Sequence, residues 1–388
     1  MTVKLYDQNS HATEFEAVVI KCEKNPSGYR VELDRTLFFP EEGGQCSDRG
    51  ILGGVNVISA QIEGDTIWHN TDAPLEPGST VNGQIDFALR FRNMQNHSGE
   101  HIICGIAHKL FGCENVGFHL GEDCVTMDLD CELTEENISL IEQLANEAVA
   151  RNLPVTAYYP EKEELRSLTF RAKGEIEGRV RIVTIGDVDS CACCAPHVSQ
   201  TGEIGIIKIT DSMRHRGGMR FTIKCGSDAL ADYAVRLLAT KEISNLLSVK
   251  QHETVQGVRK LLDDVAALRT KLGEKNRRMA ELIASSVQPT SSDICIFCDD
   301  FEPEQLRSLA NAIKEKTPGF VTAVCGCDCA GYKYVIVSES NDVADYVRSA
   351  NSALGGRGGG RQNMASGSFA ASEEAIKKYF ESSALYGR

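Results

Sequence analysis

Hydrophobic and polar residues alternate in short runs over residues 1–85, and glycine, proline and asparagine interrupt these runs. The stretches FEAVVIKC, YRVELDRTLFF and TIWHN show the pattern most clearly. An alternation with period two is typical of strands that bury one face, and turn residues between short strands favour a barrel or sandwich. Residues 1–85 are therefore predicted to form a small β-barrel-like domain.

The pattern becomes mixed over residues 86–227, where strand-like and helical stretches follow one another. CVTMDLD, RIVTI and GIIKIT predict strands, and TEENISLIEQLANEAVARN predicts a long helix. Thr134 is the expected N-cap of this helix, because a threonine hydroxyl can accept a hydrogen bond from an early backbone N–H. Glu135 and Glu136 would then lie in the first turn, where the helix dipole favours negative charge. This region is predicted to be an α/β domain.

Residues 228–288 contain no proline and keep an apolar repeat of three to four residues. This repeat predicts a long helix or an antiparallel helical pair that serves as a stalk or linker. Residues 289–388 then read as a small α/β domain with the strands ICIFCD, FVTAVCG and KYVIVSE, the helix PEQLRSLANAIKEK, a glycine-rich stretch and a terminal helix. The fold class predicted for the whole chain is α+β.

Composition and charge limit the classes of function. The chain has 388 residues, 42% of them hydrophobic, and a formal net charge of −14. This charge argues against a protein that coats nucleic acid generically, but local basic patches still permit a nucleic-acid substrate. No apolar run reaches membrane-spanning length, and the N-terminal stretch lacks the pattern of a secretory signal. The expected compartment is the cytoplasm, where the 15 cysteines would be reduced thiols or metal ligands rather than a disulfide framework.

Two His/Cys motifs in the central region are candidates for a metal site. NHSGEHIICG places His97 and His101 on one face of a helix, and CACCAPH gives Cys193 and His197 a Cys-x3-His spacing. Imidazole and thiolate are the donors that zinc prefers, and a site needs three or four of them. Each motif alone also fits an ordinary structural role, as buried histidines or as reduced thiols. Together they predict one metal site.

The stretch FFPEEGGQCSDRG, residues 38–50, is a third candidate element. Gly43 and Gly44 would let the backbone turn sharply or approach a ligand closely, and Gln45 offers both a donor and an acceptor. A simple hairpin turn is the alternative interpretation of this motif.

The C-terminal region has two further features. In ICIFCD and FVTAVCGCDCAG, the alternating cysteines are typical of small residues packed in strands, and the sequence leaves open whether they bind a second metal. In GGRGGGRQNMASG, backbone amides together with Arg357 and Arg361 could bind phosphate, for example a tRNA backbone. A flexible loop or a dimer contact is the alternative for this stretch.

FFPEEGGQCSDRG, NHSGEHIICG and CCAPHVSQTGEIG occur here in the order found in the editing domain of alanyl-tRNA synthetases. The chain also resembles the long form of the freestanding alanyl-tRNA editing proteins called AlaX, whose last domain carries a glycine-rich motif similar to LGGRGGGRQNMASG. The resemblance spans the whole chain. Nothing before residue 1 leaves room for an aminoacylation domain, so an editor without a synthetase is expected.

The resemblance implies an ATP-independent hydrolase that deacylates mischarged tRNA(Ala), chiefly Ser-tRNA(Ala) and also Gly-tRNA(Ala). It implies Zn²⁺ as cofactor, tRNA(Ala) as partner and no membrane association. The residues to which roles carry over are the zinc ligands His97, His101, Cys193 and His197, and the catalytic and substrate-binding Gln45. Thr36, Gly43 and Gly44 are further candidates for substrate binding, and Arg357 and Arg361 for tRNA binding.

The chain also departs from the family pattern. Synthetases usually have CGGTH where this chain has CCAPH, so that Cys194 becomes a rival ligand to Cys193 and Pro196 replaces a threonine. Proline at this position also occurs in freestanding and threonyl-type editing domains, which keeps Ser-tRNA(Thr) open as an alternative substrate. A non-catalytic tRNA-binding protein of the same fold is the third alternative. A homodimer through the helical segment or the C-terminal domain is also left open.

Overall fold

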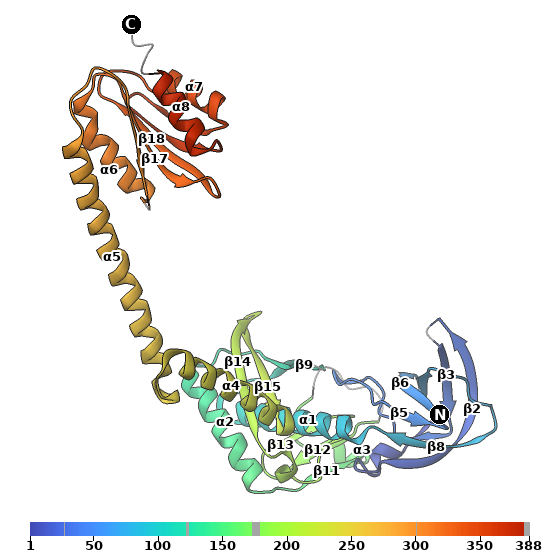
Figure 1. The fold of residues 1–388 in the computed structure, drawn as a ribbon. Helices are drawn as coiled ribbons and strands as arrows, with labels where there is room; N and C mark the ends of the chain where they lie inside the picture. The colour runs from blue at the N-terminus through green and yellow to red at the C-terminus, as the bar shows by residue number, and fades with distance from the viewer. Residues whose placement is uncertain (27, 122–123, 173–178, 300, 384–388) are drawn as a thin grey trace. The chain divides into compact units, whose positions relative to one another are not determined.

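The computed structural model describes the chain apart from residues 27, 122–123, 173–178, 300 and 384–388 (Figure 1). The chain divides into two compact units, residues 1–240 and 241–388. Helices and several separate sheets occur together in it, which confirms the predicted α+β class. None of the described helices combines the length and the apolar character that a membrane crossing requires.

The first unit begins with a closed barrel of six strands, in the segment where alternation predicts a barrel-like domain. Around the barrel the strands are β2 (Glu14–Asn25), β3 (Gly28–Leu33), β7 (Thr66–Thr71), β6 (Val55–Glu63), β5 (Gly50–Leu52) and β8 (Thr80–Ile85). Two short strands, β1 (Val3–Lys4) and β4 (Arg35–Thr36), pair in parallel. In β8 the apolar Val81 and Ile85 are buried while the intervening polar residues are exposed, as a period of two requires.

Helix α1 (Phe87–Phe111) follows the barrel and carries the histidine motif. Its start is fixed by Asp86, whose Oδ1 accepts a hydrogen bond from the Leu89 N–H at 3.1 Å. Its end is fixed by Gly112, which takes a left-handed φ of 68°. Every residue from 93 to 107 is buried, polar ones included, so this part of the helix runs through the interior of the unit.

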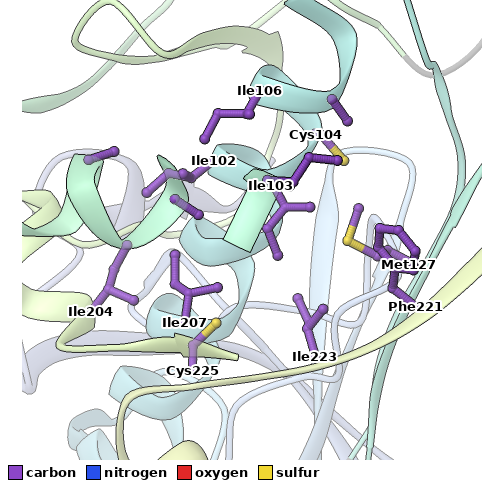
Figure 2. Close-up of a cluster of buried hydrophobic side chains, with 14 of the residues drawn as sticks. Ile102, Ile103, Cys104, Ile106, Met127, Ile204, Ile207, Phe221, Ile223 and Cys225 are labelled. Atoms are coloured by element: carbon purple, nitrogen blue, oxygen red, sulfur yellow. The ribbon is translucent and has the colours of Figure 1, made fainter. Parts of the chain in front are cut away.

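Two sheets and a second long helix surround α1. The first sheet has the order β14 (Ile207–His215), β15 (Gly218–Cys225), β10 (Val125–Leu129), β9 (Asn115–Leu120), and the second has the order β11 (Val155–Tyr158), β12 (Ile182–Ile185), β13 (Asp189–Ala192). Figure 2 shows Ile103 of α1 close to Met127 and Ile223 of the first sheet, in the main hydrophobic core. The short helix α3 (Lys162–Leu165) lies between β11 and β12 in the chain.

Helix α2 (Glu135–Ala150) begins where the sequence predicts it. The Thr134 hydroxyl accepts a hydrogen bond from the Asn137 N–H at 3.3 Å, which confirms the predicted N-cap. Two hydrogen bonds lower the pKa of the Glu136 carboxyl in the first turn. The larger effect comes from the backbone N–H of Glu136 itself and the smaller one from the Thr134 side chain. Local sequence therefore sets the start of this helix.

One pair of cysteines differs from the expectation of reduced thiols. Cys113, just after α1, and Cys131, just after β10, form a disulfide with their Cα atoms 5.5 Å apart. This separation lies in the ordinary range for a disulfide. The prediction is wrong for this pair because the fold brings the ends of two elements together, which the cysteine spacing does not reveal.

Two helices occupy the segment predicted as a stalk, α4 (Gly226–Leu247) and α5 (Thr254–Ser286). The 3-10 turn Gln251–Glu253 separates them. Many of their apolar side chains are exposed, including Leu238, Leu246 and Leu268. The predicted helical content of this segment is confirmed, as two helices rather than one.

The second unit contains a five-stranded sheet with the order β16 (Ile294–Cys298), β17 (Phe320–Cys327), β18 (Gly331–Ser338), β20 (Met364–Phe369), β19 (Arg357–Arg361). One hydrophobic cluster joins the sheet to α6 (Pro303–Ile313) and the end of α5, and another joins it to α7 (Ala344–Leu354) and α8 (Glu373–Ser383). The glycine-rich stretch forms the antiparallel pair β19–β20, so its interpretation as a flexible loop is wrong.

Candidate metal centre

Four side chains from distant parts of the sequence meet between α1 and the loop after β13. The Nε2 or Nδ1 atoms of His97, His101 and His197 and the Sγ of Cys193 all lie within 4.8 Å of one another. His97 and His101 are held one helical turn apart by α1, and Cys193 and His197 come from the loop. The structure thus brings together the two half-sites that the sequence predicts.

Each histidine of this four-donor cluster is oriented by a hydrogen bond at its Nδ1. The Nδ1 of His97 lies 2.8 Å from Gln45 Oε1, that of His101 lies 3.0 Å from Asp189 Oδ2, and that of His197 lies 3.0 Å from Ser98 Oγ. Carboxylate and amide oxygens can only accept, so Nδ1 of His97 and His101 is the donor. The Nε2 atoms therefore face the cluster, and Cys193 Sγ lies 3.6 Å from Nε2 of His97 and 3.3 Å from Nε2 of His197.

The pKa values of three buried groups in the cluster are shifted from their ordinary values. Burial opposes ionisation of Cys193, but His97, His197 and hydrogen bonds from His101 and His197 lower the pKa of its thiol well below the usual value. Burial also opposes the charged form of His101, but its bonds to Asp189 and Cys193 raise its pKa well above the ordinary value. For His197 burial dominates and lowers the pKa to about 3. The surroundings of Cys193 therefore favour its thiolate form.

This donor set fits a metal cation. One thiolate and three imidazoles, with their Nδ1 atoms already engaged, match the tetrahedral nitrogen and sulfur coordination of structural and catalytic metal sites. Partners that hold the second nitrogen of a ligating histidine are a regular feature of such sites.

Asp189, the partner of His101, is itself held by Arg171. The Arg171 guanidinium donates two hydrogen bonds to this carboxylate, at 2.8 and 2.9 Å. Burial alone would raise the pKa of Asp189, but the bonds from His101 and Arg171 lower it to about 2. Asp189 and Cys191 also form a second group of possible donors with His101. Because Arg171 already occupies both oxygens of Asp189, we assign this group to the support of His101 rather than to a second cation.

Gln45 reaches the cluster because the glycine turn of the barrel lies against β9. Gly43 and Gly44 have φ values of 63° and 82°, and the Gly44 carbonyl accepts a hydrogen bond from the Leu120 N–H at 2.7 Å. A Cβ on Gly44 would lie 2.4 Å from the Phe118 carbonyl oxygen, so only glycine fits here. The fully buried Gln45 side chain bonds His97 through Oε1, and its Nε2 has no hydrogen-bond partner among the described residues.

Thr36 is also buried, but its hydroxyl is used inside the barrel. It accepts a hydrogen bond from the Phe38 N–H at 3.0 Å and lies 2.8 Å from Nε2 of His69. Burial lowers the pKa of His69 to about 4, so its imidazole is neutral near pH 7. Its Nδ1 donates to the Val31 carbonyl oxygen, so its Nε2 accepts a hydrogen bond from the Thr36 hydroxyl. A role of Thr36 in substrate binding stays a prediction.

The neighbours of Cys193 point elsewhere. Cys194 hydrogen-bonds to Glu42 of the barrel turn, and burial, above all, raises the pKa of its thiol. Cys191 lies on the His101 and Asp189 side, outside the four-donor cluster. Arg181 fixes the loop itself, donating to the carbonyl oxygens of Cys193 and Ala195 at 3.1 and 2.8 Å. The geometry thus favours Cys193 over either neighbour as the ligand.

Several residues that the sequence singled out lie outside this centre. Arg357 and Arg361 are exposed at the two ends of β19 in the second unit. Among the described residues of that unit, the cysteines form no group of three donors. Arg90, just before the histidine motif in the sequence, is fully buried and paired with Asp48, so it cannot contact phosphate at the surface.

Three residues of the centre escape the motif analysis: Ser98, Asp189 and Arg171. Ser98 lies between the two histidines in sequence, and Asp189 lies four residues before Cys193. A polar residue beside a His/Cys half-site is a usable signal for such partners. Arg171 offers no comparable signal, because it lies 18 residues from Asp189 in the chain.

Known families match two parts of the chain. Residues 180–221, which include Cys193 and His197, match the family described as threonyl and alanyl tRNA synthetase second additional domain. Residues 292–382, most of the second unit, match the DHHA1 domain.

Individual relatives match over much longer stretches. The alanyl-tRNA editing protein Aarsd1 of Mus musculus is 31% identical over 290 residues, which is 70% of this chain and 69% of the relative. Aarsd1-A of Xenopus laevis is 32% identical, over 72% of each chain. The alanyl-tRNA editing protein AlaX-L of Pyrococcus horikoshii is 26% identical over 97% of this chain and 96% of its own. The chain therefore belongs to the family of alanyl-tRNA editing proteins.

Proposed function

We propose that this protein is a zinc-dependent trans-editing hydrolase, which cleaves the ester bond between a wrong amino acid and tRNA(Ala). The chief substrate would be Ser-tRNA(Ala), with Gly-tRNA(Ala) as a second one. The observation that carries the proposal is the four-donor cluster, whose three imidazoles are each oriented by a hydrogen bond at Nδ1. The names of the relatives support editing of alanyl-tRNA in general.

His97, His101, Cys193 and His197 would hold the zinc ion. When bound, the ion would supply a positive charge that orients and polarises the aminoacyl ester. Asp189 and Ser98 would keep the imidazoles in place, since outer partners of this kind set both tautomer and ring orientation. Zinc is preferred over other metals because the donors are three nitrogens and one sulfur.

Gln45 would have two tasks, one for each end of its amide. Its Oε1 holds the ring of His97, and its buried Nε2 is a donor without a partner among the described residues. A substrate oxygen could satisfy this donor, which supports the assignment of Gln45 as a catalytic and substrate-binding residue. A site that bonds the serine hydroxyl can reject alanine by a factor of about 10⁴ in favourable cases, because alanine leaves buried polar groups unpaired.

The other predicted contacts complete the proposal. Gly43 and Gly44 would line the aminoacyl pocket, and Thr36 would join them if its hydroxyl exchanged His69 for substrate. Arg357 and Arg361 would bind the tRNA backbone from β19. The proposed division is a barrel domain at 1–85, an editing domain at 86–227, a helical linker at 228–288 and a C-terminal domain at 289–388.

Deacylation assays would test the proposal directly. Ser-tRNA(Ala), Ala-tRNA(Ala) and Ser-tRNA(Thr) are each incubated with the full chain, with and without a zinc chelator. We expect rapid release of serine from Ser-tRNA(Ala), little release of alanine, and loss of activity with chelator that added zinc restores. Faster hydrolysis of Ser-tRNA(Thr) would move the assignment to the threonyl system. No hydrolysis of any of the three would overturn the enzymatic function.

A further inference from the structure

One end of the three-stranded sheet β11–β12–β13 lies beside the loop that carries Cys193. There the last residue of β11 pairs with Ile182, the first residue of β12, and Ile182 pairs with the last residue of β13. Tyr159 directly follows this row of residues, Arg181 directly precedes it, and the Cys193 N–H donates to the Arg181 carbonyl oxygen at 3.0 Å. Because neighbouring strands lie about 4.8 Å apart, the backbone of Tyr159 is about 10 Å from that of Cys193.

The side chain of Tyr159 is tied to the same loop through Asp7. The Tyr159 hydroxyl donates a hydrogen bond to Asp7 Oδ2 at 2.8 Å, and Nε of Arg181 lies 3.4 Å from Asp7 Oδ1. Arg181, whose side chain is buried, also donates to the carbonyl oxygens of Cys193 and Ala195. Tyr159 is therefore fixed relative to the loop that supplies two of the four donors.

Arg179 lies over the aromatic ring of Tyr159. Its Cζ is 4.4 Å from the centre of the ring, which is the geometry of a cation–π contact. Arg179 is exposed, and its guanidinium has no ion pair or hydrogen bond among the described residues. Two other exposed arginines of the first unit, Arg151 and Arg214, are each paired with a carboxylate. Stacking thus holds the plane of the Arg179 guanidinium and leaves its N–H groups free to donate.

A guanidinium with free N–H groups and a fixed plane is suited to a phosphate group, to which it can donate two parallel hydrogen bonds. The chain as a whole carries a net charge of −14 and repels a polyanion, so contact with a nucleic acid depends on local cations of this kind. The aminoacyl ester of a charged tRNA lies on its last nucleotide, close to the last phosphates of the strand.

We propose that Arg179, held in place by Tyr159, binds a backbone phosphate in the single-stranded 3′ end of tRNA. This contact rests on the proposed function, which places the aminoacyl ester at the four-donor cluster. Arg179 contacts the phosphate, and Tyr159 is a positioning residue that acts through the guanidinium. The network of Asp7 and Arg181 sets the separation between the phosphate and the cluster, so that a bound 3′ end delivers the ester to the site.

Binding of uncharged tRNA(Ala) to the full-length, zinc-loaded protein over a series of salt concentrations would test this contact without any hydrolysis. With Arg179→Gln, we expect affinity to fall about tenfold, because a charged hydrogen-bonded contact is lost. The slope of log affinity against log salt should become shallower by about 0.7, the value for one phosphate of a single strand. Arg214→Gln is the matched control and should change neither quantity. Unchanged affinity and slope in Arg179→Gln would overturn the proposal.

Substitutions of Tyr159 separate the ring from its hydroxyl. Tyr159→Ala should weaken binding nearly as much as Arg179→Gln, and the double variant should bind no more weakly than Arg179→Gln alone, because the ring acts through the guanidinium. Tyr159→Phe keeps the ring and should retain most of the affinity. Additive losses in the double variant would overturn the positioning role of Tyr159. Circular dichroism verifies that each variant is folded.

A second measurement compares hydrolysis of Ser-tRNA(Ala) with that of the serine ester of adenosine, which carries the ester and the base but no phosphate. In Arg179→Gln, the ratio of the two kcat/KM values should fall about tenfold, through KM, because only the tRNA substrate loses a charged contact. If the unmutated protein hydrolysed neither substrate, the proposed function would fail, and the binding measurement would still decide the role of Arg179. An active protein with an unchanged ratio would show that the phosphate contact does not serve the ester.

Discussion

The stretches CACCAPH at 191–197 and CGCDCAG at 325–331 look alike in sequence, with three cysteines each within a few residues. In the first, Cys193 lies among three histidines in a four-donor cluster. In the second, Cys325 is buried while Cys327 and Cys329 are exposed at the end of a β-hairpin, and the whole second unit contains a single histidine, His252. Cysteine density alone is therefore a poor indicator of a metal site.

The difference lies in what the rest of the fold brings to each stretch. The first lies beside two imidazoles of α1. Gln45 of the barrel turn accepts a hydrogen bond from one of them, and Arg171 donates to Asp189 in the strand that precedes the stretch. In the second, Asp328 bonds to β18 and to the start of α8, and Cys325 accepts a hydrogen bond from the Phe301 N–H. A metal site needs donors held in place by further partners, and these come from distant segments of the chain.

Removal of Cys193 should have the largest effect, and an unchanged zinc content would contradict the contrast between the two cysteine-rich stretches. With Cys193→Ala, we expect zinc content to fall from about one ion per chain to below about a tenth of that, with parallel loss of deacylation, because three imidazoles alone bind more weakly. Elemental analysis after dialysis measures this, and circular dichroism verifies the fold. Cys194→Ala and Cys325→Ala are matched controls that should keep the metal. Full zinc content and full deacylation in Cys193→Ala would show that the ligand assignment is wrong.

Asp189 and Asp328 offer a second test, with a smaller expected effect. Each carboxylate organises its own stretch, but only Asp189 bonds a histidine of the cluster. Asp189→Asn should weaken zinc affinity by about 10–100-fold, because a neutral amide accepts the hydrogen bond of His101 more weakly than the carboxylate does. Competition with a chromophoric chelator measures the affinity.

Asp328→Asn is the control, and it should leave zinc affinity unchanged. Asp189 also pairs with Arg171, so the apoprotein of Asp189→Asn should be less stable, and affinity is measured at a temperature where it is folded. Equal affinities for the two variants would mean that the bond between Asp189 and His101 does not support the site.

The fold could be predicted from the sequence as far as periodicity reports it. Alternation located the strands of the barrel, and the helix after Thr134 begins where its cap predicts. The glycine-rich hairpin β19–β20 was missed, because glycines and exposed arginines carry no apolar alternation. The disulfide between Cys113 and Cys131 was missed for a different reason, since it joins two elements that are adjacent only in space.

For the site, the sequence identified donors but not their support. His97, His101, Cys193 and His197 follow from spacing and from the resemblance, and the structure brings them together. The bond from His101 to Asp189 spans 88 residues, and the one from Ser98 to His197 spans 99. A motif within one short segment cannot reveal hydrogen bonds between residues so far apart in the sequence. The buried pair of Arg90 and Asp48 is a further example, because its two members lie 42 residues apart.

The smallest predicted effect concerns two cysteines of the second stretch that lie only two residues apart. The buried Cys325 accepts a hydrogen bond from the Phe301 N–H at 3.2 Å and packs in the cluster under α6, whereas Cys327 is exposed. Cys325→Ala leaves that N–H without its partner, which should cost about 1–2 kcal/mol of unfolding free energy. Cys327→Ala should change it by less than about 0.5 kcal/mol, as surface substitutions usually do. Urea denaturation of the reduced full-length protein, with the transition of the second unit followed separately, measures both. If the two variants lost the same stability, the contrast between a packed Cys325 and an exposed Cys327 would be wrong.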